Sequence, residues 1–270
     1  MGVWKRVRLE CVRIATWNVN GLRARLDYVC LWLEARQPDV VGLQELKLET
    51  DAFPHERFAE LGYVAAVHGQ KSWNGVAVLS REAAEVQQAG LPRQEAFGAR
   101  LLDVTVAGLR FVTLYCPNGK SVDHDDFPQK LAWFDALAGW VAANIKPDTP
   151  AVLVGDYNIA PAAADSWLGA KGDGELFHTE AERARFEALL ACGFVDFYRT
   201  HLPEGRDFSW WDYRGGAFHR GHGLRIDLML GTEAVARRVT DVVIDRDFRK
   251  KQDGLTASDH APVYADLRDA

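Results

Sequence analysis

The sequence predicts one α/β domain whose β-sheets are mixed or antiparallel. Helical and strand-like periods of apolar residues alternate along the 270 residues, and no linker, low-complexity tract or fixed-period repeat divides them. Two strand-like runs, 101–106 and 109–114, flank Ala107-Gly108 as in an antiparallel hairpin. This hairpin and the close spacing of the last strand-like runs favour mixed or antiparallel sheets over a purely parallel, doubly wound fold.

Helices are predicted in three places. Apolar residues at i, i+3, i+4 and i+7 mark an amphipathic helix from Leu26 to Leu33, which Pro38 ends. A second helix is predicted to begin near Pro128, a residue suited to the first turn, and a third covers 180–191. The residues expected to face inward are Leu131, Phe134, Leu137 and Val141 in the second helix and Phe186, Leu189 and Leu190 in the third.

Short apolar runs bounded by turn-forming residues predict the strands. The first is 14–17, and a Trp73-Asn74-Gly75 turn precedes another at 76–79. The other predicted strands are 40–43, 101–106, 109–114, 151–154, 226–230, 239–244 and 263–267.

The composition, with 48% hydrophobic and 26% charged residues, is that of an ordinary globular protein. No apolar run reaches the roughly 18 residues of a membrane-spanning helix, and the N-terminus lacks the apolar segment of a signal peptide. The four cysteines show no CxxC spacing, so we expect neither a zinc site nor a disulfide framework but thiols packed in the core, in a reducing cytoplasm. A net charge of −6 gives no overall attraction to nucleic acid, so such a partner would need a local basic face.

Polar residues end or interrupt several of the predicted strands. They are Asn18, Glu45, Tyr115, Asp156, Asn158, Asp227, Asp259 and His260. Each has a local explanation as well: Asp156 and Asn158 would share one face of an extended strand, but they and Gly155 also favour a turn, and Asp227 could be the ion-pair partner of Arg225. If the strand ends gather at one edge of the sheets, these side chains form a single cleft.

The residue types in this set suit hydrolysis of a phosphate ester. Oxygen ligands such as those of Glu45 and Asn18 suit a hard cation like Mg²⁺. A carboxylate among other acids, such as Asp156, could orient and deprotonate a water molecule. Asn158 and His260 could donate hydrogen bonds to a phosphate oxygen as charge develops. The sequence has no GxSxG, P-loop or GxGxxG motif.

Eight sequence blocks in order carry a family resemblance. They are ATWNVNGLRAR (15–25), LQELK (43–47), SWNGVAVLS (72–80), LYCPNG (114–119), GDYNIAP (155–161), FSWWDYR (208–214), GLRIDLML (223–230) and SDHAPV (258–263). Together they resemble the exonuclease III-like family of abasic-site DNA endonucleases, within the DNase I-like phosphoesterase superfamily. The resemblance implies a four-layer αββα sandwich, in which helices flank two packed mixed or antiparallel β-sheets. It also implies a single catalytic domain at 12–270, with residues 1–11 as an N-terminal extension.

The resemblance implies a metal and a base for the reaction. Glu45 would be the principal Mg²⁺ ligand with Asn18 beside it, Asp259 would belong to the same site, and Mn²⁺ would substitute for Mg²⁺. Asp156 would position or activate the attacking water, and Asp227 would complete the acidic cluster.

It also implies residues that contact the substrate phosphate. Asn158 and His260 would hold the scissile group, Asp259 would orient His260, and Tyr115 would contact the phosphate or assist the leaving oxygen.

Trp210 and Leu224, with Phe208, match positions that line a pocket for a flipped-out sugar without a base, whose absence also lowers the cost of flipping. Core packing is the alternative for large aromatics, and we expect one of Trp210 and Trp211 to lie in the core. Candidate contacts to the DNA backbone are Arg23, Arg25, Lys71, Lys120 and Arg214.

The predicted substrate is double-stranded DNA with abasic sites or blocked 3′ ends, cleaved by a cytoplasmic, monomeric enzyme with no membrane partner. The activities implied are incision 5′ to abasic sites, removal of 3′-blocking groups and 3′–5′ exonuclease action on duplex DNA. One alternative is a 3′-end-cleaning phosphatase with weak abasic-site incision. Two others are a superfamily phosphatase acting on inositol phosphates or phospholipid head groups, and an inactive DNA-binding module.

Residues 162–179 depart from the family pattern as a Gly-rich, variable segment. We expect Trp167 or His178 to narrow the entrance to the cleft there, which would favour trimming of blocked 3′ ends over internal incision.

Overall fold

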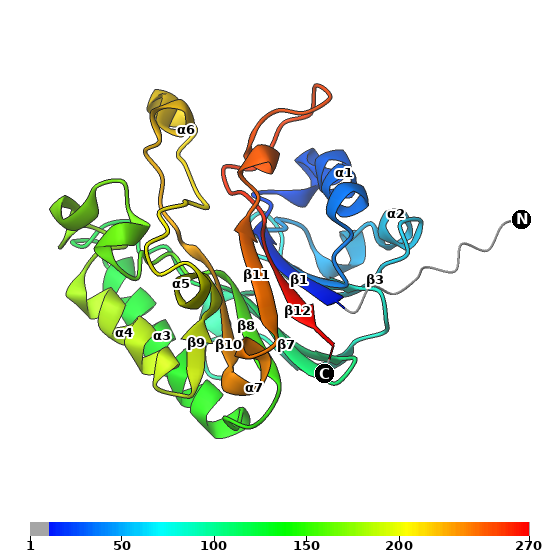
Figure 1. Ribbon diagram of the computed structural model, residues 1–270, viewed down its shortest axis with the longest axis horizontal. Coiled ribbons are helices and arrows are strands. Elements are labelled where there is room, and N and C mark those ends of the chain that lie inside the picture. The colour runs from blue at the N-terminus through cyan, green and yellow to red at the C-terminus, as the bar shows by residue number, and fades with distance from the viewer. Residues whose placement is uncertain (1–10, 270) are drawn as a thin grey trace, which may run out of the picture.

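Two six-stranded β-sheets form the centre of the protein, whose computed structural model describes residues 11–269 (Figure 1). Within this range the strand orders are β11-β12-β1-β2-β4-β3 and β5-β6-β7-β8-β10-β9. The first sheet contains β1 (Cys11–Asn18), β2 (Val40–Gln44), β3 (Val64–His68), β4 (Val76–Ser80), β11 (Val239–Ile244) and β12 (Val263–Arg268). The second contains β5 (Glu85–Ala89), β6 (Leu101–Val106), β7 (Leu109–Tyr115), β8 (Ala151–Asp156), β9 (Phe194–Asp196) and β10 (Asp227–Thr232).

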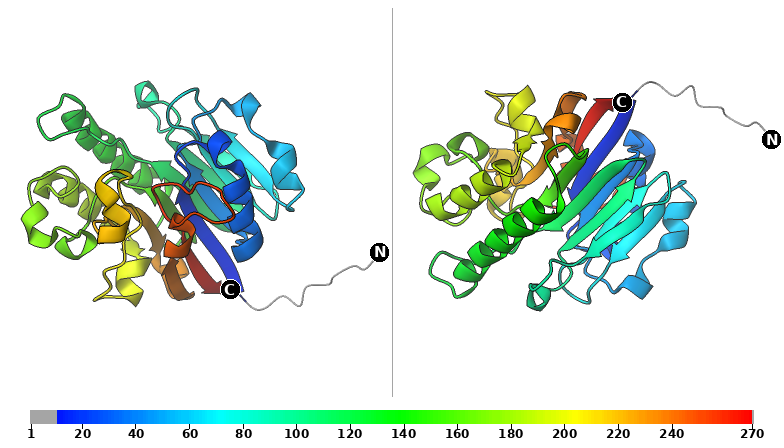
Figure 2. Two further views of the ribbon diagram at one scale, coloured as in Figure 1. Left: turned by 90° about the horizontal axis from the view of Figure 1, so that it is seen from above. Right: turned by 90° about the horizontal axis from the view of Figure 1, so that it is seen from below.

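Helices cover the outer face of each sheet (Figures 1 and 2). On the first sheet lie α1 (Leu26–Arg36) and α2 (His55–Ala59), and on the second lie α3 (Asp126–Asn144) and α4 (Glu180–Leu190). The short helices α5 (Phe197–His201), α6 (Ala217–Arg220) and α7 (Glu233–Ala236) lie in connections. None of the helices in residues 11–269 combines the length and apolar character needed to cross a bilayer.

Alternation along the strands builds three apolar layers. Trp17 of β1 points toward α1, where it packs against Tyr28 and Trp32, whereas Ile14 points between the sheets with Phe111 of β7. This alternation follows from the two-residue period of a strand. The sheets therefore bury both faces, as the four-layer prediction requires.

The two sheets approach closely beneath one edge. A Cβ at Gly42 of β2 would lie 2.5 Å from the hydroxyl oxygen of Thr113 of β7, so only glycine fits where these strands of the two sheets face each other. The amide of Gln44 donates to the hydroxyls of Thr16 (2.9 Å) and Thr113 (2.8 Å), which connects the sheets by hydrogen bonds. The strand ends above this point are consequently held at a fixed separation.

Two parallel strand pairs direct polar residues to this edge. In β1 and β2, Asn18 lies opposite Gln44, directly before Glu45. In β7 and β8, Tyr115 lies opposite Asp156, and antiparallel β10 places Asp227 opposite Asp156 from the other side. Because parallel strands end at the same edge, side chains distant in sequence meet there.

The predicted fold class is confirmed, but the prediction missed strands β3, β5 and β9, and some element boundaries differ. The second helix begins at Asp126, two residues before Pro128, and it buries Lys130 while Leu131 is only half-buried. Ile226 immediately precedes β10 instead of beginning it.

The expectation that the thiols pack in the core is wrong for Cys11. Cys11, the first residue of β1, is exposed. Cys30 and Cys116 are buried, and Cys192 is half-buried. All four are free thiols. Apart from Cys11, the N-terminal extension predicted at 1–11 lies outside the described residues.

Candidate active site

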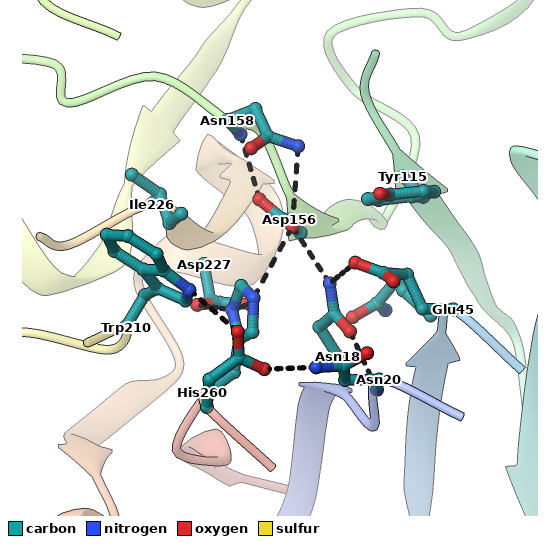
Figure 3. A network of polar contacts seen from close by, with 12 residues as sticks. Asn18, Asn20, Glu45, Tyr115, Asp156, Asn158, Trp210, Ile226, Asp227 and His260 are labelled. Atoms are coloured by element: carbon teal, nitrogen blue, oxygen red, sulfur yellow. Dashed lines mark hydrogen bonds and ion pairs between the residues drawn. The ribbon is translucent and has the colours of Figure 1, made fainter. Parts of the chain in front are cut away.

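Polar side chains from both sheets meet where β1, β2, β7 and β8 end (Figure 3). In the view of Figure 3, Trp210 and Ile226 lie on one side of Asp156, and Tyr115 and Glu45 lie on the other. The Nδ2 group of Asn18 donates to Glu45 (2.8 Å) and to Asp156 (2.9 Å), which links the first sheet to the second. The predicted convergence of strand-end residues is confirmed by these contacts.

Asp156 and Asn158 reach the site through a turn. Asn158 has a left-handed φ of 50°, and its backbone N–H donates to Oδ1 of Asp156 at 2.9 Å. Its side-chain amide donates to the carbonyl of Cys116 at 3.0 Å and lies 3.4 Å from Oδ2 of Asp156. The turn that local chemistry favours is thus the means by which both side chains enter the same site.

Asp156 has the environment of a general base. Burial raises its pKa to about 7; His260 opposes this shift, while Asp227 and Glu45 add to it. A carboxylate with a pKa near neutrality is well matched to accepting a proton from water at physiological pH.

His260 is held as a proton donor by Asp227. Its Nδ1 atom lies 2.8 Å from Oδ2 of Asp227, and its Nε2 atom lies 3.9 Å from Oδ2 of Asp156. Burial alone lowers the pKa of His260, but Asp227, followed by Asp156 and Asp259, outweighs it and raises the pKa to about 10. The ring is therefore an imidazolium at neutral pH, with Nε2 directed to the side of Asp156.

The expected pairing of Asp259 with His260 is wrong. The carboxylate of Asp259 accepts from Nδ2 of Asn20 (2.8 Å) and from the indole N–H of Trp210 (3.1 Å). Burial raises the pKa of Asp259, but His260, Asn20 and Trp210 together lower it below its ordinary value. Asp259 thus fixes the Trp210 ring instead of the imidazole.

The residues around Glu45 suit a hard divalent cation. Within residues 11–269, Glu45, Asp156 and His260 form the group whose ligand atoms all lie within 4.8 Å of one another. Because His260 is an imidazolium, the carboxylate oxygens of Glu45 and Asp156 are the better ligands, while the Asn18 group between them is the donor Nδ2. The raised pKa of Asp156 shows uncompensated negative charge that a cation would offset. Asp259, assigned to the metal from sequence, lies outside this group.

Sequence reasoning missed Lys47 and Asn20, which lie beside the acidic cluster. Nζ of Lys47 lies 3.0 Å from Glu45 and also donates to Oδ1 of Asn20 at 2.5 Å. The block LQELK contains this lysine two residues after Glu45, so its position was available as a signal. Asn118, in the block LYCPNG, donates to Oδ1 of Asn158 at 3.3 Å and is the third missed residue.

Tyr115 remains a phenol. Burial raises its pKa well above the ordinary range, and Glu45 and Asp156 add to the shift. Arg100 lies over the ring, 4.6 Å from its centroid. The hydroxyl can therefore donate to a phosphate oxygen but does not act as a phenolate.

Trp210 and Leu224, two of the residues predicted to line an apolar slot for the sugar, lie beside one another next to His260. Trp210 pairs through backbone bridges with Leu224 on one side and His260 on the other, and Ile226, which was missed from sequence, lies next to the Trp210 ring (Figure 3). Trp211 is buried against Phe218, as predicted for one of the two tryptophans. Phe208 packs in the cluster of Trp211, away from its predicted place in the slot.

Arg225 holds the segment that precedes β10. It is buried and pairs with Asp165 (2.6 Å) and Asp196 (2.8 Å), so the alternative in which it pairs with Asp227 is wrong. The carboxylate of Asp227 is left for His260.

The candidate DNA contacts differ in how free they are. Arg23 and Lys71 are exposed, whereas Lys120 pairs with Asp126 and Arg214 pairs with Asp212. Arg25 donates to the hydroxyl of Tyr213 at 3.1 Å.

The expectation that His178 narrows the cleft is wrong. His178 is buried, and its ring contacts the hydroxyl of Ser166 at 2.9 Å and the carbonyl of Leu176 at 2.8 Å. Trp167 is 45% exposed and stacks on His222, with ring centroids 3.7 Å apart and planes at 7°. The Trp167–His222 stack is therefore an exposed aromatic pair close in sequence to Leu224.

The chain matches known proteins over nearly its full length. Residues 15–260 match the model of the endonuclease/exonuclease/phosphatase family. Exodeoxyribonuclease III of Haemophilus influenzae is 33% identical, with 95% of this chain and 100% of that protein covered. Exodeoxyribonuclease of Bacillus subtilis is 28% identical, with 93% and 98% covered.

Solved structures give the same result for the fold. A 3′-5′ exonuclease from Neisseria meningitidis is 39% identical with a TM-score of 0.90, and 96% of this chain and 100% of that one are covered. A 3′ phosphatase from Neisseria bound to a product DNA hairpin is 39% identical with a TM-score of 0.89, covering 95% and 99%. An AP endonuclease from Archaeoglobus fulgidus is 34% identical with a TM-score of 0.90, covering 96% and 100%.

Proposed function

Since the chain belongs to the endonuclease/exonuclease/phosphatase family, we propose that this active site hydrolyses phosphate esters at abasic sites and blocked 3′ ends of DNA. The enzyme is a metal-dependent DNA phosphodiesterase of the exonuclease III-like type, with relatives named for exonuclease and AP endonuclease activity. The observation that carries the proposal is the buried pair of Asp156 and His260, with Oδ2 3.9 Å from Nε2, beside Trp210.

In this proposal each residue has a part in the hydrolysis. Asp156 orients a water molecule and accepts its proton. His260 donates from Nε2 to a non-bridging phosphate oxygen, and Asn158 holds a second one. Tyr115 donates toward the leaving oxygen. Glu45, with Asn18 beside it, would hold Mg²⁺, which would supply positive charge for the phosphate oxygens. These contacts strengthen as negative charge develops, which is what accelerates the reaction.

A slot at Trp210 would select a sugar that has lost its base. The half-buried Trp210 would offer its ring to one face of a deoxyribose, with Leu224 buried beside it, and Asp259 holds the ring in place. Exposed Arg23 and Lys71 would contact the DNA backbone without reading sequence. The proposal includes a monomer in the cytoplasm, where a reducing environment keeps four free thiols in that state.

Removal of the metal tests the proposal directly. We expect wild-type enzyme with Mg²⁺ to cut a duplex with an internal abasic analogue and to release phosphate from a nicked duplex with a 3′-phosphate. EDTA should abolish both reactions, Mn²⁺ should restore them, and Glu45→Gln should need at least about tenfold more Mg²⁺. Gel assays of end-labelled duplexes and a phosphate-release assay measure these rates.

Two results would contradict the proposal. Activity that is undiminished in EDTA would remove the metal from the reaction. Phosphate release from a phosphoinositide, with neither duplex cleaved, would move the function to the inositol phosphate or phospholipid alternative.

The Trp167–His222 stack favours 3′-end cleaning as a second candidate function. The backbone N–H of Trp167 donates to the carbonyl of Gly223 at 3.0 Å, and Ser166 forms a β-bridge with Leu224. The stack is therefore fixed to the segment that precedes β10. An exposed indole at this position would hinder a continuous duplex more than a strand end.

We expect Trp167→Ala to raise internal abasic-site incision about tenfold relative to 3′-phosphate removal, since aromatic contacts with bases have this magnitude. Trp167→Phe, which keeps a ring on His222, should change the ratio much less. The ratio of kcat/KM on the two duplexes is the measurement, and an unchanged ratio would reject the role of Trp167.

A further inference from the structure

A fully buried ion pair lies directly beneath the phosphate-binding residues. Lys130 of α3 and Glu182 of α4 both have side chains that are 0% exposed, and Nζ of Lys130 lies 2.5 Å from Oε1 of Glu182. The two helices lie side by side on the second sheet (Figure 1). An ammonium in such a place needs an acceptor for each of its three protons.

The other two acceptors are backbone carbonyls of active-site loops. Nζ of Lys130 donates to the carbonyl of Asn158 at 2.7 Å and to that of Asn118 at 3.2 Å. The side chains of these two asparagines are joined by the hydrogen bond from Asn118 to Asn158. One ammonium therefore holds the backbone of both residues.

Glu182 in turn fixes the segment that follows the active-site turn. Its carboxylate accepts from the N–H of Phe177 (3.1 Å) and from the N–H (3.0 Å) and hydroxyl (2.8 Å) of Thr179, while Thr179 caps α4. The pair thus joins three segments, after β7, after β8 and before α4.

The backbone of Asn158 is held in the left-handed region, with φ 50°. Asparagine tolerates this conformation, and the contact of its carbonyl with Lys130 fixes where the turn lies relative to the sheet. Stability alone is a weak reason for a buried ion pair, since well-packed apolar residues often replace one without loss. A role in setting the geometry of Asn158 accounts for the charged pair.

We propose that the Lys130–Glu182 pair is a positioning device that holds Asn158, and with it Asn118, in the orientation that binds the scissile phosphate. This inference rests on the proposed function of the same site. Lys130 touches neither substrate nor metal, so it acts through Asn158.

A double-mutant cycle on phosphate release from the 3′-phosphate duplex tests the proposal. We expect Lys130→Met to lower kcat by about 30-fold with little change in KM, because a small misplacement of a positioning group is costly. In the Asn158→Ala variant, adding Lys130→Met should lower kcat by less than about a further threefold, because the effect of Lys130 passes through Asn158. The matched control is Arg110→Met, which removes the partner of buried Asp103 at the far end of β7 and should lower thermal stability without lowering kcat.

The outcomes separate this inference from the proposed function. A Lys130→Met loss of equal size in both backgrounds, or an unchanged kcat, would overturn the positioning role. Full activity of Asn158→Ala by itself would instead overturn the proposed role of Asn158. If Lys130→Met does not fold, Glu182→Gln keeps the lysine and its carbonyl contacts. It should lower kcat about fivefold in the wild-type background only, and an additive loss would overturn the inference.

Discussion

Asp156→Asn is expected to lower kcat on the abasic-site duplex by about 1,000-fold, equivalent to about 4 kcal/mol of transition-state stabilisation, with KM nearly unchanged. The amide keeps the size of the carboxylate but has no lone pair basic enough to accept the proton of water. One of its two polar atoms also becomes a donor, facing the Nδ2 group of Asn18 that Asp156 now accepts. Single-turnover kinetics on a labelled duplex measure the loss at the chemical step.

The pH profile of the wild type should have a rising limb set by Asp156 and a falling limb set by His260. Asp156 works when deprotonated, and its pKa is raised to about 7, so kcat/KM should rise with pH up to that value. A bound cation adds positive charge and lowers the pKa, which moves this rising limb below pH 7. His260 works when protonated, and its pKa of about 10 places the falling limb there.

Asp103→Asn is the matched control for Asp156→Asn. Asp103 is also a buried carboxylate whose pKa is raised by burial, but it pairs with Arg110 on β6 and β7, away from the site. We expect this variant to lose stability and keep kcat, whereas Asp156→Asn should raise the melting temperature of the metal-free protein at pH 8, because it removes a buried charge. A retained rate in Asp156→Asn would exclude Asp156 as the base.

The strand ends were predictable because each apolar run stops at a polar residue. The runs before Glu45 and Asp156 are continuous, as expected for strands buried on both faces, and parallel pairing then brings their ends together. The pattern of apolar residues therefore predicts both the strands and the ends at which the site forms.

The partners within the site depend on register, which local sequence does not reveal. Asp227 meets His260 because β10 pairs with β8 so that Asp227 lies opposite Asp156, a relation between segments about 70 residues apart. The family resemblance implied Asp259 instead, but the side chains of these consecutive residues point in different directions, and the Asp259 carboxylate accepts from Trp210. Lys130 was missed for a related reason: a lysine beside an apolar helix face looks exposed until its buried acceptors are known.

Asp227→Asn should move the whole pH profile toward lower pH and lower kcat at pH 8 by about 100-fold, the cost of one lost donor to a developing charge. Without the carboxylate at 2.8 Å, burial dominates and the pKa of His260 falls from about 10, so the falling limb enters the neutral range. Asp227 also raises the pKa of Asp156, so its removal lowers that pKa and shifts the rising limb in the same direction.

The comparison with Asp259→Asn decides which carboxylate controls the imidazole. Asp259 contributes less than Asp227 to the raised pKa of His260, so its replacement should leave the falling limb near its wild-type position. Its effect should appear in KM for the abasic duplex, because the Trp210 ring loses its hydrogen bond. Profiles of kcat/KM from pH 5 to 10 for the two variants, with the imidazole protons of His260 followed by NMR, measure both effects. A loss of amplitude in Asp227→Asn with no displacement of either limb would show that His260 does not act as an imidazolium, and the phosphate would then be held by Asn158 and the cation alone.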